Sequence, residues 1–228
     1  MLREIIMSFL PLTPEQVIEL QAPLDGANVK SRNKGGVTLG YIEGWHAIAE
    51  ANRIFGFDGW SRQTIRCEPT HQPIERENSK SKMLWHAGYM AVVRITAGSV
   101  CRDGTGFGSG AQGILGDSIE SAIKEAETDA MKRALMTFGN PFGLALYDKS
   151  REHVTNTDAI NQYRSAQQQR VLFKRLGEGI DECQSAHEID VFLENHAREL
   201  RNIKQDWQSH WNDKVARRRQ LLEQMAAA

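Results

Sequence analysis

Six residues of this chain combine charge and aromaticity in a way that suits phosphate binding. They are Lys30, Arg32, Lys34, Tyr41, Lys132 and Arg133. Cationic side chains neutralise phosphates, and a nearby aromatic ring offers a face or a hydroxyl to a nucleotide. Grooves that bind single strands without regard to sequence use this combination. Residue types alone do not decide whether these six form such a groove.

The same residues also have an ordinary structural interpretation. Alternating basic residues at 30–34 are typical of a solvated loop, and Tyr41 could belong to the core. Lys132 and Arg133 fall in the last two turns of a predicted helix, where cations complement the helix dipole and Asp129 can pair with Arg133. Spacing alone favours this second interpretation of Lys132 and Arg133.

A glycine-rich run contains the spacing G-x-G-x-x-G at Gly108, Gly110 and Gly113. Dinucleotide-binding βαβ units use this spacing, with an acidic residue about 20 positions later at the end of a second strand. Here the acidic residues at that distance lie inside one predicted helix, and no Walker A lysine follows. We interpret the run as a bulged, flexible loop. A nucleotide-dependent enzyme is kept as an alternative.

No group of residues suggests catalysis or metal binding. The seven histidines lack H-x-x-x-H spacing, and Cys67, Cys101 and Cys183 lack C-x-x-C spacing and form no disulfide framework. A nucleophile-elbow signature is also missing. We therefore expect no catalytic residue, no metal, no cofactor, and reduced thiols in an intracellular protein.

Composition narrows the function classes further. The 228 residues carry 28 Lys+Arg against 29 Asp+Glu, a formal net charge of −1, which excludes a simple polycation. A local basic groove stays open, because counterion release depends on the charges at the contact. We expect no signal peptide and no membrane partner, since no apolar run approaches about 20 residues. Either Met1 or Met7 could be the start.

Hydrophobic patterning predicts the elements that position these residues. The expected elements are a helix at 13–22, a loop at 23–36, a strand at 37–39, a helix at 41–56, strands at 61–68, at 84–96 and from 100 onward, and a polar loop at 71–82. A long helix should begin near Asp117, where Asp117 and Glu120 resemble a capping box, and end at Gly139.

After residue 153 the chain becomes rich in Gln, Arg and Glu. A helix at 159–183 should be interrupted near Gly177 and Gly179, and a capping box at Ser185 and Glu188 should begin another. Apolar positions then repeat in steps of four and three. They are Ile189, Leu193, His196, Leu200, Ile203 and Trp207. We expect a core at 1–152 and a helical hairpin or oligomerising helix at 153–228.

Two features of this C-terminal region have alternative interpretations. The apolar repeat more often packs inside its own chain than against a partner, and Trp207 and Trp211 should dock on another element. The basic triplet at 217–219 is either a solvated helix end or a tip that contacts phosphate.

Three ordered strings resemble the Rad52/22 family of double-strand-break repair proteins. Residues 32–45 read R-x-x-G-G-x-x-x-x-Y-I-E-G-W, residues 51–60 read A-N-x-x-F-G-x-x-G-W, and residues 124–143 read K-E-A-x-T-D-x-x-K-R-A-L-x-x-F-G-N-x-x-G. The likeness covers roughly residues 13–150. It implies an α+β fold with an antiparallel β-β-β-α core and flanking helices, followed here by the C-terminal helical hairpin.

The resemblance also implies a DNA-binding site. It therefore favours phosphate binding over the ordinary structural role of the basic residues. The positions that match the family's motifs are Arg32, Tyr41, Lys132 and Arg133. These four are expected to contact the phosphate backbone, and Tyr41 should also position a nucleotide. Candidates for secondary DNA contacts are Lys30, Lys34, Lys80 and Lys82.

The chain departs from the family pattern in two places. Met136 stands where the family often has a third basic residue after the Lys-Arg pair. Residues 113–116 read G-I-L-G where the family has a lysine-rich loop, which weakens the case for a second, outer DNA site. Lys80 and Lys82 are partial substitutes for that loop.

The implied function is single-strand annealing in homologous recombination and double-strand-break repair, by a homo-oligomeric ring on single-stranded DNA, without ATP or metal. The alternative is a recombination mediator that binds a recombinase or a single-strand-binding protein and anneals little. A short chain with a helical tail suggests a bacterial or phage protein, located in the cytoplasm at the nucleoid or in a phage-infected cell.

Overall fold

The computed structural model describes residues 10–226, without the side chains of Lys34 and Ala226. The chain divides into two compact units, residues 1–161 and residues 162–228. The boundary between them falls inside helix α5 (Thr157–Glu182). Both candidate starts, Met1 and Met7, lie outside the described residues.

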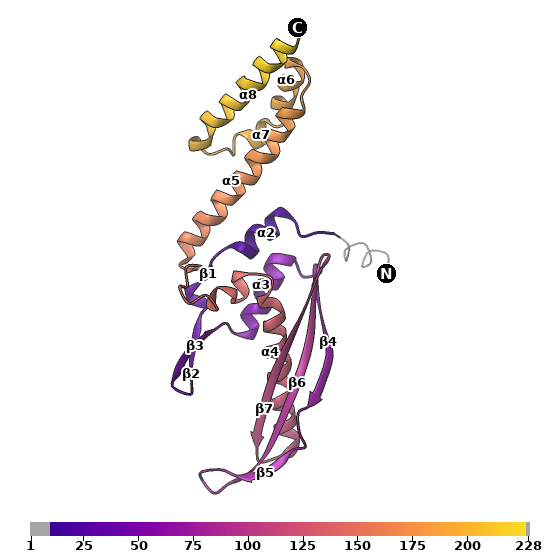
Figure 1. Ribbon diagram of the computed structural model, residues 1–228, viewed down its shortest axis with the longest axis vertical. Coiled ribbons are helices and arrows are strands. Elements are labelled where there is room, and N and C mark those ends of the chain that lie inside the picture. The colour runs from indigo at the N-terminus through magenta and orange to yellow at the C-terminus, as the bar shows by residue number, and fades with distance from the viewer. Residues whose placement is uncertain (1–9, 227–228) are drawn as a thin grey trace. The chain divides into compact units, whose positions relative to one another are not determined.

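A four-stranded antiparallel sheet forms the framework of the first unit (Figure 1). Its strands are β4 (Trp60–Pro69), β5 (Ile74–Glu77), β6 (Met83–Ala97) and β7 (Val100–Gln112). One edge of β6 pairs with β7 from Trp85 to Ala97, and the other edge pairs with β5 near its start and with β4 further on. The tyrosine, valine and isoleucine residues of β6 favour this central position.

The glycine-rich run is strand β7, so the expected flexible loop is wrong. Alternate glycines from 104 to 110 face helix α4 (Leu115–Met136). A Cβ atom at Gly106 would lie 2.2 Å from the backbone nitrogen of Ala130, and one at any of the other three would come within 2.3 Å of the helix backbone. Glycine is required here because the helix and strand backbones touch.

Helix α4 also begins differently from the prediction. It starts at Leu115 after Ile114, whose side chain makes no cap, so the predicted capping box at Asp117 and Glu120 is wrong. The buried Ser118 hydroxyl anchors this end instead. It donates to the carbonyl of Trp85 at 2.7 Å and accepts the N–H of Gln112 at 2.8 Å.

Two polar stretches expected as loops contain strands. The stretch at 71–82 includes β5, which pairs with the start of β6. The stretch at 23–36 includes β1 (Leu24–Asp25), a 3-10 turn η1 (Gly26–Asn28) and β2 (Lys30–Lys34). Strand β1 pairs in parallel with β8 (Val154–Thr155). Each of these short strands takes its hydrogen bonds from a partner strand, which is distant in the sequence for β1 and adjacent for β2 and β5, so local composition does not reveal the pairing.

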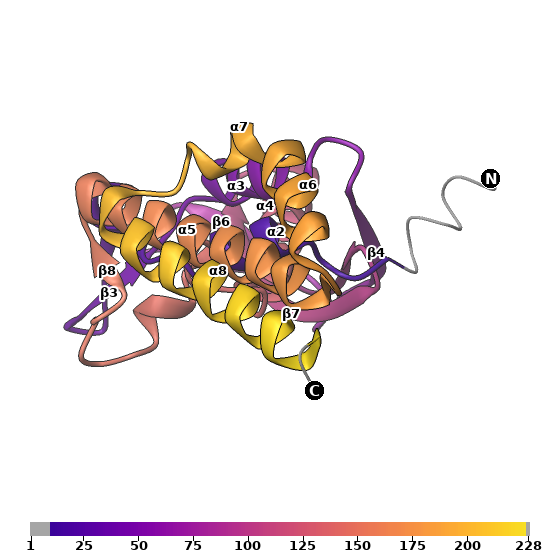
Figure 2. The same cartoon turned by 90° about the horizontal axis from the view of Figure 1, so that it is seen from above.

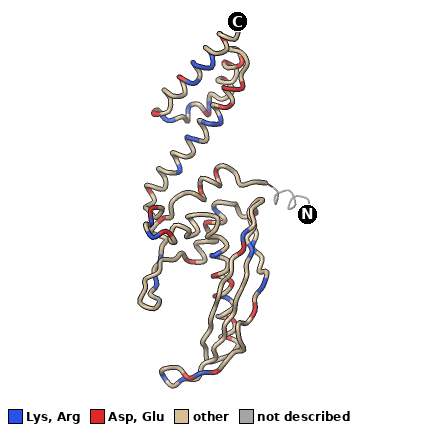
Figure 3. The backbone as a smooth tube through the Cα atoms, viewed as in Figure 1, with Lys and Arg blue, Asp and Glu red and all other residues tan. Residues whose placement is uncertain are grey.

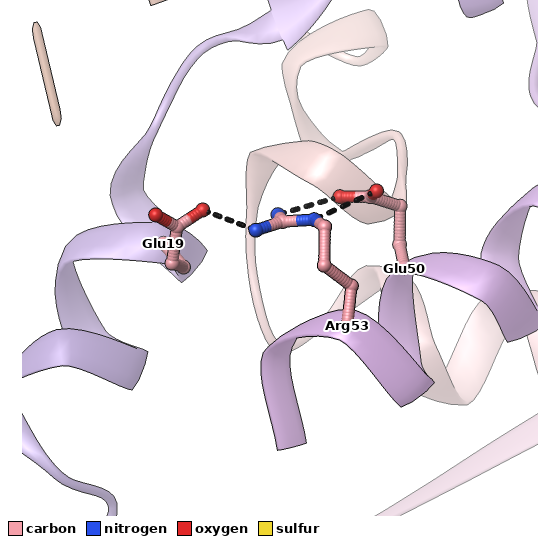
Figure 4. A network of polar contacts seen from close by, with 3 residues as sticks. All are labelled: Glu19, Glu50 and Arg53. Atoms are coloured by element: carbon pink, nitrogen blue, oxygen red, sulfur yellow. Dashed lines mark hydrogen bonds and ion pairs between the residues drawn. The ribbon is translucent and has the colours of Figure 1, made fainter. Parts of the chain in front are cut away.

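The first unit also contains helices α2 (Pro14–Gln21) and α3 (Gly44–Phe55). Thr13 and Gln16 form a capping box at the start of α2, where a helix is predicted. Arg53 of α3 links the two helices (Figure 4): its guanidinium donates to Glu19 at 2.6 Å and to Glu50 at 2.8 Å and 3.0 Å. This network joins α2 to α3, and α3 packs against α4.

The core of the first unit lies between the inner face of the sheet and the helices. Alanines on α4 and aliphatic residues on β6, such as Val93 and Ile95, are fully buried. Phe55 packs against Phe138 and Phe142, with ring centroids 5.4 Å and 6.0 Å apart. Two 3-10 turns, η2 (Asn140–Phe142) and η3 (Leu144–Leu146), follow α4.

The second unit is helical and has its own core. The rest of α5 packs with α6 (Ala186–Asn195), α7 (Ala197–Leu200) and α8 (Gln205–Ala226), and α5 and α8 lie side by side (Figure 2). Ser185 accepts the N–H of Glu188 at 3.2 Å, which confirms the predicted start of α6. The predicted C-terminal hairpin is thus extended by the short helices between its two long ones.

Helix α5 continues through both of its glycines, so the predicted interruption is wrong. A Cβ atom at Gly179 would lie 2.3 Å from Cε2 of Phe192, and one at Gly177 would lie 2.7 Å from Cε of Lys214. Glycine is accepted in this helix because α6 and α8 approach it closely.

The predicted α+β class with C-terminal helices is confirmed. The antiparallel sheet packs on helices in the first unit, and helices alone make up the second. Over the described residues, no helix is both long enough and apolar enough to cross a membrane.

Candidate nucleic-acid interface

A cavity of about 500 Å³ in the first unit is lined by all four residues that match the family motifs. Arg32 comes from β2, Tyr41 from β3 (Val37–Tyr41), and Lys132 and Arg133 from α4. The fold therefore gathers into one site residues that lie far apart in the sequence. Lys132 is half-buried, while Arg32 and Arg133 are exposed.

A tight hairpin carries Arg32 and Tyr41. Strands β2 and β3 are joined by Gly35 and Gly36, whose φ angles of +60° and +81° suit the two-residue turn of a right-twisted hairpin. The register pairs Arg32 with Leu39, which puts Arg32 on the same face as Tyr41, two residues further along β3. Blue segments in Figure 3 mark the basic residues of this hairpin.

Arg133 forms the ion pair that its spacing predicts. Its Nε donates to Oδ2 of Asp129 at 3.0 Å, one turn earlier on α4. The Arg133 side chain is 53% exposed, so this pair contributes only a few tenths of a kcal/mol. A phosphate can therefore compete for the guanidinium at little energetic cost.

Lys132 lies in an electropositive and partly dehydrated place. Burial lowers the pKa of its ammonium group, and the charges of Arg32 and Arg133 lower it further, while Asp129 and Glu125 act in the opposite direction. Burial and mutual repulsion raise the electrostatic energy of these positive charges, and an anion bound among them would lower it.

Tyr41 contacts two of these cations through its ring. The Arg32 Cζ atom lies 5.6 Å and the Lys132 Nζ atom 5.7 Å from the ring centroid. Both distances fall in the range of cation–π attraction. The tyrosine thus offsets part of the repulsion between Arg32 and Lys132. Its predicted role in positioning a nucleotide stays a prediction.

Three of the four candidates for secondary contacts, Lys30, Lys80 and Lys82, do not line this cavity. Lys30 is exposed, and its backbone pairs with Tyr41. Lys80 and Lys82 are exposed in the turn between β5 and β6 (Figure 1), where Asn78 Oδ1 accepts both of their N–H groups. The side chain of Lys34 lies outside the described residues.

Asp129, Tyr147 and Arg151 are among the cavity residues that were not foreseen as part of a site. Asp129 was expected only as the ion-pair partner of Arg133, whereas Tyr147 and Arg151 come from the polar stretch after α4. Nothing in the local sequence distinguishes an isolated arginine of this kind from a solvated one. Met136 also lines the cavity, so the departure from the family motif falls within the site itself.

The basic triplet at 217–219 has partners inside the second unit. Arg218 donates from Nε to the carbonyl of Cys183 at 3.1 Å, at the end of α5, and Arg219 pairs with Asp190. These contacts favour a structural role for two of the three arginines. Among the described residues, no group of three or more His, Cys, Asp or Glu side chains could hold a metal ion.

Comparison with known proteins identifies the family. The model of the Rad52/22 family of double-strand break repair proteins matches residues 15–165. The chain therefore belongs to this family, as the resemblance of its motifs indicates.

Several fungal relatives are similar to part of the chain. It is 39% identical over 144 residues to the DNA repair and recombination protein RAD52 of Eremothecium gossypii, covering 58% of this chain and 31% of that protein. It is 37% identical over 118 residues to the DNA repair and recombination protein rad22 of Schizosaccharomyces pombe, covering 50% and 24%. The chain thus matches less than a third of either relative. Fungal relatives give no support to the expected bacterial or phage origin.

Proposed function

We propose that this protein binds single-stranded DNA and anneals complementary strands in recombination and double-strand-break repair. The observation that carries the proposal is the convergence of Arg32, Tyr41, Lys132 and Arg133 on one cavity. Relatives named as DNA repair and recombination proteins support the same process.

In this mechanism the protein positions a DNA strand and neither forms nor breaks a covalent bond. Cations in the cavity neutralise phosphates of one strand and hold its backbone extended, so that base edges stay free to test a second strand. Pairing energy comes from the bases, so we propose no ATP, no metal and no catalytic residue. Repetition of the cavity around a homo-oligomeric ring would add weak contacts by multivalency.

The test is a salt titration of binding to a labelled oligothymidine. Arg133→Ala should weaken binding several-fold at low salt and make the negative slope of log K against log salt shallower by about 0.7, the value for one phosphate on a single strand. Arg102→Ala removes an exposed arginine that does not line the cavity and should leave the slope unchanged. Equal slopes for the wild type and Arg133→Ala would contradict the assignment of the groove.

A recombination mediator is the second candidate. It would bind single-stranded DNA through the same cavity but anneal poorly, and it would act on a recombinase or on DNA coated by a single-strand-binding protein. Annealing of complementary oligonucleotides with and without such a coat separates the two functions. An annealing protein accelerates pairing of bare strands, whereas a mediator changes only the coated reaction.

The glycine spacing does not favour a nucleotide-dependent enzyme. Gly108 and Gly110 face helix α4 inside a strand, where their missing side chains make room for its backbone. We therefore expect no thermal stabilisation by nucleotides.

A further inference from the structure

Arg151 has a backbone conformation that arginine rarely adopts. Its φ of +54° lies in the left-handed region, which glycine, asparagine and aspartate enter with least strain. Hydrogen bonds on both sides fix this turn: the Arg151 N–H donates to the carbonyl of Asp148 at 3.2 Å, and the Val154 N–H donates to the carbonyl of Arg151 at 3.0 Å. The turn therefore imposes the conformation and does not explain why arginine occupies it.

The side chain of Arg151 extends to the cavity that Arg32, Lys132 and Arg133 line. Its Nη2 atom lies 3.2 Å from the point that a Cβ atom at Gly40 would occupy, so the guanidinium rests against strand β3 next to Tyr41. The glycine leaves the room that the guanidinium uses. A strained residue whose charged end lies in a binding cavity suggests that the side chain is kept for binding.

Charge also points to an anion at this position. None of the described acidic side chains forms an ion pair with Arg151, whereas Arg133 in the same cavity pairs with Asp129. A guanidinium presents its N–H groups in a planar fork that matches two oxygens of a phosphate. Arg151 can therefore meet a ligand without breaking an ion pair with a described acidic residue.

We propose that Arg151 is a further phosphate-binding residue of the cavity and contacts the backbone of the same single strand. The proposal rests on the function proposed above, and it adds a contact from the turn before β8 to those from β2 and α4. The left-handed backbone and Gly40 together position its guanidinium.

The test is Arg151→Asn in the full chain, measured on labelled oligothymidine across a salt series. Asparagine tolerates the left-handed backbone and removes the charge. We expect several-fold weaker binding at low salt, a negative slope of log K against log salt that is shallower by about 0.7, and an unchanged or higher melting temperature. Arg151→Gly relaxes the same turn and should behave alike, while Arg151→Lys should restore most of the slope. Arg102→Asn is the matched control for loss of one exposed arginine.

The outcomes separate this inference from the proposed function. If Lys132→Ala weakens binding but Arg151→Asn and Arg151→Gly bind as the wild type does, the role of Arg151 is refuted. The assignment of the cavity as the DNA-binding site is then kept. If the wild type fails to bind single strands, the proposed function itself fails. If Arg151→Asn and Arg151→Gly lower the melting temperature in proportion to the loss of binding, Arg151 stabilises the turn. Its assignment as a phosphate-binding residue is then overturned.

Discussion

At the scale of the residue, the electrostatic surroundings of Lys132 favour a bound anion. The ammonium group lies 5.7 Å from the Tyr41 ring centroid, and its pKa is lowered by burial and by the charges of Arg32 and Arg133. Asp129 offsets only part of this effect. A neighbouring phosphate would stabilise the charged form, so binding of DNA should raise the pKa of Lys132 toward its ordinary value.

The lowered pKa predicts a pH dependence with opposite signs for folding and for binding. Since the pKa of Lys132 is lower in the folded state, its contribution to stability rises with pH between the folded and unfolded pKa values. Binding needs the charged form, so affinity for oligothymidine should fall as the pH rises through the lowered pKa. Lys132→Arg stays charged and should lose this part of the pH dependence.

Affinity measured at constant salt from neutral to alkaline pH checks this prediction. Lys174→Arg changes an exposed lysine of α5 that does not line the cavity, and it should keep the wild-type profile. Identical profiles for Lys132→Arg and the wild type would show that another group governs the pH dependence.

At the scale of elements, the contact between β7 and α4 positions half of the site. Helix α4 carries Lys132 and Arg133, and its place on the sheet is set by glycines that let the two backbones touch. Buried alanines on the helix, among them Ala126, Ala130 and Ala134, complete this contact. A side chain added between the elements must push the helix away and shift the cations with it.

Gly106→Ala should therefore destabilise the fold strongly. The new Cβ atom would lie 2.2 Å from the nitrogen of Ala130, which is rigid backbone. We expect a loss of about 3 kcal/mol in the free energy of unfolding, at the upper end of the usual range for overpacking. Urea denaturation gives the value.

Gly116→Ala is the matched control, because a Cβ atom there meets nothing within 4 Å and the residue lies in the first turn of α4. This variant should be neutral or more stable by up to about 1 kcal/mol. Equal effects of the two substitutions would mean that the strand glycines are not required for packing.

These elements also show what the sequence can and cannot predict. The sheet strands at 61–68 and 84–96 and the helices at 13–22 and 41–56 carry clear patterns, and the structure contains each of them with shifted ends. A strand from residue 100 onward is predicted, but its continuation through the glycines of β7 was missed, because these glycines make room for the helix that follows, a requirement that composition does not display. Strand β2 was missed because its polar residues have low strand propensity, and pairing with β3 supplies its hydrogen bonds.

In the candidate site, four residues were predicted from the family resemblance, and the structure shows which other residues line the same cavity. Arg32, Tyr41, Lys132 and Arg133 match ordered family strings, so they could be predicted although spacing alone favoured an ordinary role for the last two. Arg151 lies beyond the matched strings, and only its turn and Gly40 bring it to the cavity. A contact made by tertiary structure leaves no local signal.

At the scale of the whole molecule, a net charge of −1 conceals a local concentration of cations. One cavity gathers Arg32, Lys132, Arg133 and Arg151, and Asp129 is the only acidic residue among the described residues that line it. Binding should therefore depend on salt as a few-phosphate site does, and long strands would need several such cavities in one assembly.

The apolar repeat of the C-terminal region bears on how that assembly forms. Ile189 and Ile203 are buried in the core of the second unit, and Leu193, Leu200 and Trp207 pack against it. Trp207 and Trp211 both contact Phe173, with ring centroids 5.2 Å and 6.0 Å apart. The repeat is thus used within its own unit, as the first of the two interpretations predicts.

Truncation after Asn161 should consequently leave the number of protomers unchanged. The first unit keeps its own core, and the cut preserves the pairing of β8 with β1 and the hydrogen bond from Thr157 Oγ1 to Asp25 Oδ2 at 2.6 Å. Light scattering after size exclusion should give the full-length mass less one second unit per protomer, and the truncated protein should still bind oligothymidine. A fall to fewer protomers would show that the second unit mediates assembly.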